Sequence, residues 1–216
     1  MIKNELIKRV CSSIILIPIV LFVIIEGSIL FNFFISICFI LAAYEWFQMS
    51  KLNIQKILGL LFIIISFYTI FKIRNDFNQD YFHILLIAII CVSTDTGGYI
   101  LGKLLKGPKL TQFSPNKTYA GAFGGFLFSI IITILFFELS LKTYNYKFTE
   151  ETFIFVLLVS LVSQIGDIII SYFKRLSEIK DTGNIIPGHG GILDRIDGMI
   201  FAYPFSYLVF LNWNIQ

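Results

Sequence analysis

Long runs of hydrophobic residues alternate with short polar segments along the whole chain. Several of these runs approach the ~20 residues that an α-helix needs to cross a bilayer. We expect membrane-spanning helices at about residues 10–26, 28–48, 56–73, 82–102, 119–138, 152–173 and 196–212. Only Glu26-Gly27-Ser28 separates the first two runs, so a single kinked or re-entrant element is an alternative there, with a total of six to eight spans. The pattern predicts an all-α fold, a polytopic transmembrane helix bundle of about seven spans.

Composition supports a membrane protein. The chain has 216 residues, of which 56% are hydrophobic and 14% are charged, whereas soluble domains carry about 25% charged residues. The basic segment before the first run resembles a secretory signal, but no small-residue cleavage site follows it, so we expect a retained helix. A net charge of +3 is too small to indicate a nucleic-acid partner. The lipid bilayer is the expected partner, with the basic residues serving topology and contact with anionic headgroups.

The basic residues are distributed unevenly between the two sets of loops, which predicts the orientation through the positive-inside bias. With the N-terminus in the cytoplasm, thirteen of the 17 basic residues face inward, and four face outward: Lys72, Arg74, Lys142 and Lys147. We therefore expect an integral protein of the cell inner (cytoplasmic) membrane. The polar loops 103–118 and 174–195 then face the cytoplasm, where nucleotides and Mg²⁺ are found. We divide the chain into N-terminal transmembrane helices, 1–81, and a catalytic transmembrane domain, 82–216, whose two loops form the active-site cavity.

Carboxylates within hydrophobic runs cost about 2.5–3.5 kcal/mol on insertion scales, so each needs a reason. Glu26, Glu45 and Glu138 stand near the ends of runs, where solvation at the membrane interface is the simpler interpretation. Asp95 lies in the segment Ser93-Thr94-Asp95-Thr96-Gly97-Gly98-Tyr99. It is either a buried, hydrogen-bonded residue of a helix-packing motif or part of the rim of a cation or substrate site.

Asp167 lies on a polar stripe. Helical spacing places Gln164, Asp167, Ser171 and Lys174 on one face of the sixth run, at steps of three and four residues. This face leads from the hydrophobic centre into the second cytoplasmic loop. A continuous polar face on a spanning helix must meet water, protein or ligand, so we expect a functional role for Asp167.

The loop 103–118 ends in Ser114-Pro115-Asn116-Lys117-Thr118. Ser followed by Pro is typical of a helix N-cap and first turn, which predicts a helix that begins here. Its free N–H groups, together with Lys117, would suit a phosphate. A capped helix with a lysine that only sets topology explains the same residues equally well.

The loop 174–195 carries the strongest chemical signal. Lys174, Arg175 and Lys180 can bind the oxygens of a lipid phosphate or a nucleotide, and the glycine-rich turn 187–191 lets backbone amides approach an anion. Asp194 and Asp197 follow three residues apart. Carboxylates beside phosphates suit Mg²⁺, which takes only one or two protein ligands, so Asp167 and Asp194 are candidates to meet at one ion.

These segments resemble the CDP-diacylglycerol synthase (phosphatidate cytidylyltransferase) family. The segment from Ser171 to Asp197 matches the family signature at every defined position: Ser171-x-Phe173-Lys174-Arg175, four residues, Lys180-Asp181-x-Gly183, two residues, Ile186-Pro187-x-His189-Gly190-Gly191-Ile192-x-Asp194-Arg195-Ile196-Asp197. The Asp95 segment, Ser114-Pro115-x-Lys117-Thr118 and Gln164-x-Gly166-Asp167 also resemble family features in the expected order. One departure is Ala120, where family members usually carry Glu.

The resemblance implies transfer of the cytidylyl group from CTP to phosphatidate, which gives CDP-diacylglycerol and pyrophosphate for phospholipid synthesis. It implies Asp167 and Asp194 as Mg²⁺ ligands, optional K⁺ beside the metal, and a homodimer. By the same match Lys174 and Arg175 act with the two aspartates in catalysis. The implied substrate-binding residues are Asp95, Ser114, Lys117, Ser171, Lys180, His189, Arg195 and Asp197.

Two other functions are compatible with parts of the sequence. A CTP-dependent polyprenol kinase also combines a membrane bundle with polar loops, but it would release CDP, and the complete signature argues against it. A small transporter could use Asp95 and Asp167 to bind a coupling ion. However, the sequence shows no internal repeat, and its charges gather at one side of the membrane.

Overall fold

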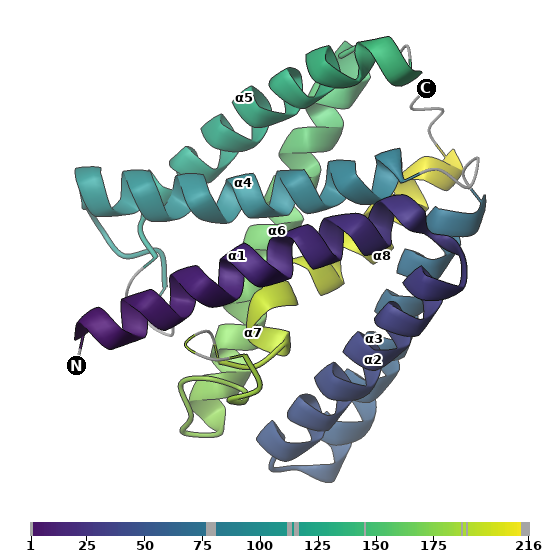
Figure 1. The fold of residues 1–216 in the computed structure, drawn as a ribbon. Helices are drawn as coiled ribbons and strands as arrows, with labels where there is room; N and C mark the ends of the chain where they lie inside the picture. The colour runs from purple at the N-terminus through teal and green to yellow at the C-terminus, as the bar shows by residue number, and fades with distance from the viewer. Residues whose placement is uncertain are drawn as a thin grey trace. The chain divides into compact units, whose positions relative to one another are not determined.

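The computed structural model describes residues 2–212 apart from 77–80, 112–113, 115–116, 145, 187 and 189, and it leaves aside the side chains of 2–11 and 141–144. The described part is α-helical apart from two isolated β-bridges, Lys109–Thr118 and Ile186–Gly190. Figure 1 shows the helices α1 (Ile2–Glu26), α2 (Ser28–Met49), α3 (Asn53–Asp76), α4 (Phe82–Leu105), α5 (Tyr119–Tyr144), α6 (Glu150–Leu176), α7 (Leu193–Ile196) and α8 (Met199–Asn212).

Each predicted hydrophobic run forms a helix or the greater part of one, so the all-α prediction is confirmed. In the described part of the chain, five helices, α2 to α6, are long and apolar enough to cross a membrane, and two shorter apolar helices cover Ser12–Glu26 and Met199–Asn212. The first two runs form separate helices. Gly27 lies between them with φ 68°, a left-handed conformation that glycine adopts without penalty, and Ser28 follows with φ 53°.

Contacts divide the chain into two compact units. The first contains residues 1–81 and 173–197, and the second contains residues 82–172 and 198–216. Helix α6 therefore contributes residues 150–172 to the second unit and its last residues to the first.

In the first unit α2 and α3 form a helical hairpin (Figure 1), as expected for two helices joined by only a few residues. Phe31 and Ile63, each 1% exposed, belong to its core. Trp46 of α2 packs against Gly59 of α3, where no side chain would fit, and its indole N–H donates to the Gln55 carbonyl (3.1 Å). Trp46 also contacts the Phe173 ring, with 5.1 Å between ring centroids, and so links the hairpin to the segment 173–197.

The second unit is built around the contact between α4 and α5, whose N-terminal part lies against the C-terminal half of α4 (Figure 1). Glycines form this contact: a Cβ atom on Gly124 would lie 2.6 Å from the Gly97 carbonyl oxygen, and one on Gly121 would lie 2.8 Å from the Gly98 carbonyl oxygen. Small residues let helix backbones approach closely, which is a common packing device in membranes. The polar segment of α4 is thereby brought beside the start of α5.

Helices α6 and α8 complete the second unit. The Tyr203 hydroxyl of α8 donates to the Ile84 carbonyl of α4 (3.3 Å), and Phe155 of α6 packs against Phe210 of α8 with 5.2 Å between ring centroids. Many large hydrophobic side chains elsewhere stay exposed, such as Ile29 on α2 (85%) and Leu58 on α3 (60%). Lipid is the solvent that suits such surfaces, because its chains are as apolar as these side chains.

Candidate active site

The second unit contains a polar cavity of about 290 Å³. It lies where α4, α5, α6 and the segment that precedes α5 meet, and three charged residues line it: Asp95, Lys117 and Asp167. The other lining residues are Thr94, Gly98, Tyr99, Leu110, Ser114, Thr118, Gly121, Ala122, Gln164 and Ile168. Three of the residues predicted for substrate binding, Asp95, Ser114 and Lys117, and one predicted metal ligand, Asp167, therefore share one cavity.

The start of α5 differs from the prediction. Helix α5 begins at Tyr119, and the capping residue is Thr118, whose hydroxyl accepts from the Gly121 N–H (3.1 Å) while its carbonyl accepts from the Ala122 N–H (2.9 Å). The predicted N-cap at Ser114 is wrong, and Pro115 lies outside the described residues. The Ser114 carbonyl instead accepts from the Lys117 N–H (3.0 Å) in a turn.

Backbone hydrogen bonds tie the base of this turn together. The Leu110 N–H donates to the Lys117 carbonyl (2.8 Å), and the Tyr119 N–H donates to the Pro108 carbonyl (3.2 Å). These bonds fix the backbone at Lys117 directly beside the helix cap. The sequence did not predict this pairing, in which the Lys109–Thr118 bridge joins residues nine positions apart.

Lys117 forms an ion pair with Asp167 across the cavity. Both side chains are 25% exposed, so water and small ligands reach the pair. The Ser171 hydroxyl, one helical turn along α6, donates to the other Asp167 carboxylate oxygen (3.3 Å). The predicted stripe is helical as expected, since Gln164, Asp167, Ser171 and Lys174 all lie within α6.

Asp95 is exposed at the cavity, so the alternative of a buried aspartate is wrong, whereas Gly97 and Gly98 of the same segment do pack against α5. Its neighbour Thr94 is the buried residue: the Thr94 hydroxyl bonds to the Ser160 hydroxyl of α6 (2.8 Å). The Gln164 amide donates to the Ala122 carbonyl of α5 (3.5 Å). These hydrogen bonds hold α4 and α5 to α6 beside the cavity.

In the first unit, Asp194 is held by three donors. Its Oδ1 accepts from the Lys174 ammonium (2.9 Å), and its Oδ2 accepts from the backbone N–H groups of Thr182 (2.8 Å) and Gly191 (3.0 Å). The side chains of Lys174 and Asp194 are only 11% and 3% exposed. Gly190, with φ 88°, leaves space for the carboxylate, because a Cβ atom there would lie 2.7 Å from Oδ2.

Glu45 is the functional candidate that the sequence prediction missed. The expected interfacial position is wrong for this residue, which is 2% exposed, whereas Glu26 and Glu138 are exposed. Its Oε2 accepts from the Thr182 hydroxyl (2.9 Å) and the Leu193 N–H (2.8 Å), and its Oε1 accepts from the Ile192 N–H (2.9 Å). The sequence around Glu45 gives no sign of these donors, because they stand 137 to 148 residues later.

The remaining predicted site residues of the first unit lie closer to the surface. Arg175, Lys180 and Arg195 are exposed, and Asp197 is half-buried. The Arg175 guanidinium donates to the Ile179 carbonyl (3.1 Å), and Asp197 has helical backbone angles directly after α7. His189 lies outside the described residues.

The two predicted metal ligands belong to different units, Asp167 to the second and Asp194 to the first. Their convergence on one ion therefore stays a prediction. Among the residues that the structure describes, no group of three or more His, Cys, Asp and Glu side chains gathers at one point. Mg²⁺ does not need such a group, because it keeps water molecules and binds substrate phosphates.

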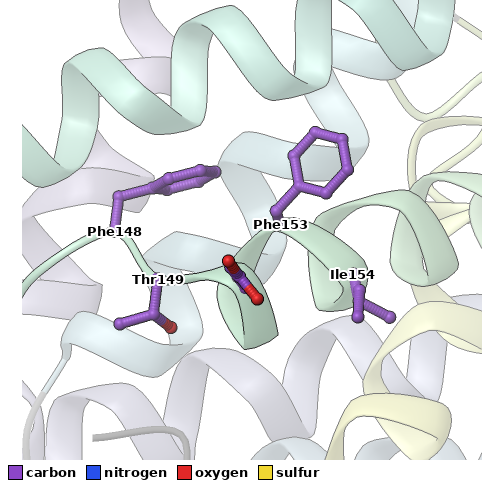
Figure 2. A pocket seen from close by; sticks show the side chains of 5 residues that line it. Phe148, Thr149, Phe153 and Ile154 are labelled. Atoms are coloured by element: carbon purple, nitrogen blue, oxygen red, sulfur yellow. The ribbon is translucent and has the colours of Figure 1, made fainter.

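A second cavity of about 460 Å³ has a different character. It is lined by Phe148, Thr149, Glu150, Phe153 and Ile154 at the start of α6. Figure 2 shows that Phe148 and Phe153 extend to the same side of the chain. With aromatic rings and one carboxylate, this lining offers no cation for a phosphate, so the smaller cavity is the better candidate site.

Comparison with known proteins assigns the chain to a family. The model of the cytidylyltransferase family matches residues 7–71 and 52–213. The chain belongs to the cytidylyltransferase family. It is 36% identical to the phosphatidate cytidylyltransferase of Rickettsia bellii over 213 residues, which cover 96% of this chain and 91% of that protein. The phosphatidate cytidylyltransferase of Bacillus subtilis is 35% identical over 153 residues, 70% of this chain and 56% of that protein.

The segment from Ser171 to Asp197, which carries the family signature, contributes residues to both polar centres. The long signature segment contributes Ser171 to the cavity ion pair through Asp167, and it contributes Lys174, Thr182, Gly191 and Asp194 to the buried centre of the first unit. Signature glycines stand where a side chain would collide with a carboxylate: Gly190 beside Asp194, and Gly183 and Gly191 beside Glu45.

Proposed function

We propose that this chain transfers the cytidylyl group of CTP to phosphatidate and produces CDP-diacylglycerol and pyrophosphate. The observation that carries the proposal is family membership along nearly the whole chain, joined to a polar cavity in a protein whose helices suit a bilayer. A membrane-embedded enzyme can take a lipid substrate directly from the bilayer and a nucleotide from the water at the same membrane face.

The reaction is a substitution at phosphorus. A phosphate oxygen of phosphatidate attacks the α-phosphorus of CTP, and the bond from this phosphorus to the oxygen that bridges to the β-phosphorus breaks. Pyrophosphate leaves with the bonding electron pair. Catalysis of phosphoryl transfer consists mainly of positioning and of charge neutralisation. Lysine, arginine and hydroxyl groups beside carboxylates can provide both.

The residues present suit Mg²⁺. The charged lining of the cavity consists of two carboxylates, Asp95 and Asp167, and one ammonium, Lys117. A phosphate that entered this excess of negative charge would be repelled unless a cation accompanied it. Carboxylate oxygens are the donors that Mg²⁺ prefers. Asp167 and Asp194 would hold the ion, which supplies charge neutralisation for the triphosphate when bound; K⁺ is proposed beside it.

The chain's own side chains have separate roles in this proposal. Lys117 and Ser114 bind phosphate oxygens at the cavity, and Asp95 contributes to its rim. Arg175, Lys180, His189 and Arg195 contact the phosphates from the signature loop, with Asp197 beside them. Lys174 donates to the Asp194 carboxylate through their buried contact. The active site faces the cytoplasm, and a homodimer stays a prediction of the family resemblance.

One assay tests this function. Purified protein in detergent receives phosphatidate and CTP labelled at the α-phosphate, with Mg²⁺ or with a chelator. We expect label in the lipid fraction and release of pyrophosphate, both lost on chelation. With CTP labelled at the γ-phosphate and a polyprenol as acceptor, labelled lipid and released CDP would instead identify a lipid kinase. Absence of lipid product from either labelled nucleotide would contradict nucleotidyl transfer altogether.

A further inference from the structure

The carboxylate of Glu45 lies outside the signature and outside every role assigned above, yet it is among the most buried polar groups of the first unit. Its residue is 2% exposed. Burial of a carboxylate is costly unless donors satisfy its oxygens. Among the described residues no lysine or arginine forms an ion pair with it, so hydrogen bonds provide the compensation.

All three of these hydrogen bonds come from the signature loop. Thr182 donates its hydroxyl, and Ile192 and Leu193 donate their backbone N–H groups, at 2.8 to 2.9 Å. The donors are 137 to 148 residues away from Glu45 in the sequence. A single side chain of α2 thus joins the two ends of the segment 182–193.

Glu45 and Asp194 both contact the same two residues, Thr182 and Gly191. Thr182 donates its hydroxyl to Glu45 and its N–H to Asp194. Gly191 donates its N–H to Asp194, while the space where its side chain would be is filled by the Glu45 carboxylate. Removal of Glu45 would therefore loosen the donors that orient Asp194 without touching Asp194 itself.

We propose that Glu45 is a positioning residue for the reaction: its buried carboxylate fixes the two ends of the segment 182–193, at Thr182 and at Ile192 and Leu193, and thereby orients Asp194 toward the divalent cation. This inference rests on the proposed function for its link to the metal. The hold on the loop is a property of the chain that can be measured without turnover.

Glu45→Gln is the primary variant. It keeps the size of the side chain but places an NH₂ group against N–H and O–H donors. Glu45→Asp keeps an acceptor-only carboxylate on a shorter arm, and Thr182→Val removes one donor to Glu45 while it keeps the N–H that binds Asp194. Glu178→Gln is the matched control, because Glu178 is an exposed carboxylate of the same unit and forms its ion pair with the exposed Lys51.

The first measurement is hydrogen–deuterium exchange of the unliganded protein in detergent. In Glu45→Gln we expect amides of the segment 182–193 to exchange at least about tenfold faster, with α4 and α5 unchanged. Glu45→Asp and Thr182→Val should show smaller increases in the same segment, and Glu178→Gln should match the wild type. Unchanged exchange in all three test variants would overturn the proposal.

The second measurement is the Mg²⁺ concentration that gives half-maximal activity. We expect it to rise about tenfold in Glu45→Gln, which corresponds to a change of 1.4 kcal/mol, with partial recovery in Glu45→Asp. A purely structural loss would reduce the amount of active enzyme and leave this concentration unchanged, and that result would overturn the positioning role.

If the wild type makes no CDP-diacylglycerol, the proposed function fails and the link to the reaction falls with it, while exchange still decides whether Glu45 holds the loop. If Glu45→Gln does not fold, the same two measurements on Glu45→Asp and Thr182→Val decide the outcome.

Discussion

The ion pair Lys117–Asp167 of the second unit and the ion pair Lys174–Asp194 of the first unit join the same two chemical groups in different surroundings. Lys117 and Asp167 are each 25% exposed and line a cavity. Lys174 and Asp194 are 11% and 3% exposed, and two backbone N–H groups also bind Asp194. The first pair can open when a charged ligand arrives, whereas the second also holds a loop together.

Because the two ion pairs differ in exposure, they should differ in how much they contribute to stability. A partly hydrated pair contributes about 0–1 kcal/mol to stability, so its partners can exchange at low cost. Removal of one partner from a buried pair leaves an uncompensated charge and costs about 3–5 kcal/mol. Activity and stability should therefore respond differently to substitutions in the two pairs.

The largest effect is expected for Asp194→Asn. The substitution removes the negative charge that faces Lys174 and the proposed cation, and metal-dependent charge stabilisation is worth several kcal/mol. We expect conversion of phosphatidate to fall by about 1000-fold, measured with labelled CTP, in protein that still inserts into the membrane. Turnover close to that of the wild type would exclude Asp194 as a metal ligand.

The lysines test the comparison directly through stability. Lys174→Met should lower the free energy of unfolding by about 3–5 kcal/mol, because the buried Asp194 carboxylate loses the ammonium with which it forms its ion pair. Lys117→Met should lower it by about 0–1 kcal/mol, and it should mainly raise the KM for the phosphate-bearing substrates. Thermal unfolding in detergent and steady-state kinetics measure the two effects. Equal losses of stability in the two variants would show that burial does not distinguish the two ion pairs.

A smaller loss of stability is expected from a substitution at Gly97, in the close contact of α4 with α5. In Gly97→Ala the new Cβ atom would lie 2.5 Å from the Phe128 Cβ atom and would also meet the Gly124 carbonyl. Such overpacking costs about 1–3 kcal/mol, and it should part α4 from α5 and weaken the cavity. In the control Gly98→Ala the nearest atom is 3.5 Å away, so thermal stability should change little. Equal stability of both variants would contradict the close contact of α4 with α5.

The smallest effect is expected at Lys142, one of the few basic residues assigned to the outer side. Lys142→Ala should leave CDP-diacylglycerol synthesis within roughly twofold of the wild type, as for a typical surface substitution. The same labelled-CTP assay checks this. Complete loss of activity would show that the predicted outer assignment of Lys142, and with it the predicted orientation of the chain, is wrong.

The helices could be predicted from the sequence because hydrophobic run length is a local property. All seven predicted runs correspond to helices, and the break at Gly27 follows from a conformation that glycine adopts readily. The helical placement of the Asp167 stripe was predictable for the same reason, since a spacing of three and four residues needs no knowledge of the tertiary structure.

The errors arose where contacts outside the local sequence pattern decide the outcome. The serine–proline signal at Ser114 is a valid local cap signal, but the bridge between Lys109 and Thr118 moves the start of the helix to Tyr119. Glu45 looked interfacial because it stands near the end of a hydrophobic run. Its donors come from a loop more than 130 residues later, and no local pattern reveals such a partner.

The tied base of the segment 108–119 has a consequence for natural variation in this loop. Two backbone hydrogen bonds tie Leu110 to Lys117 and Pro108 to Tyr119, so the two ends of the segment 108–119 lie beside each other. A change of chain length between Leu110 and Lys117 would leave these bonds in place, with the ammonium of Lys117 opposite Asp167. A single deletion at either tied end would shift Lys117 by a residue. Length differences among relatives should therefore fall between Leu110 and Lys117.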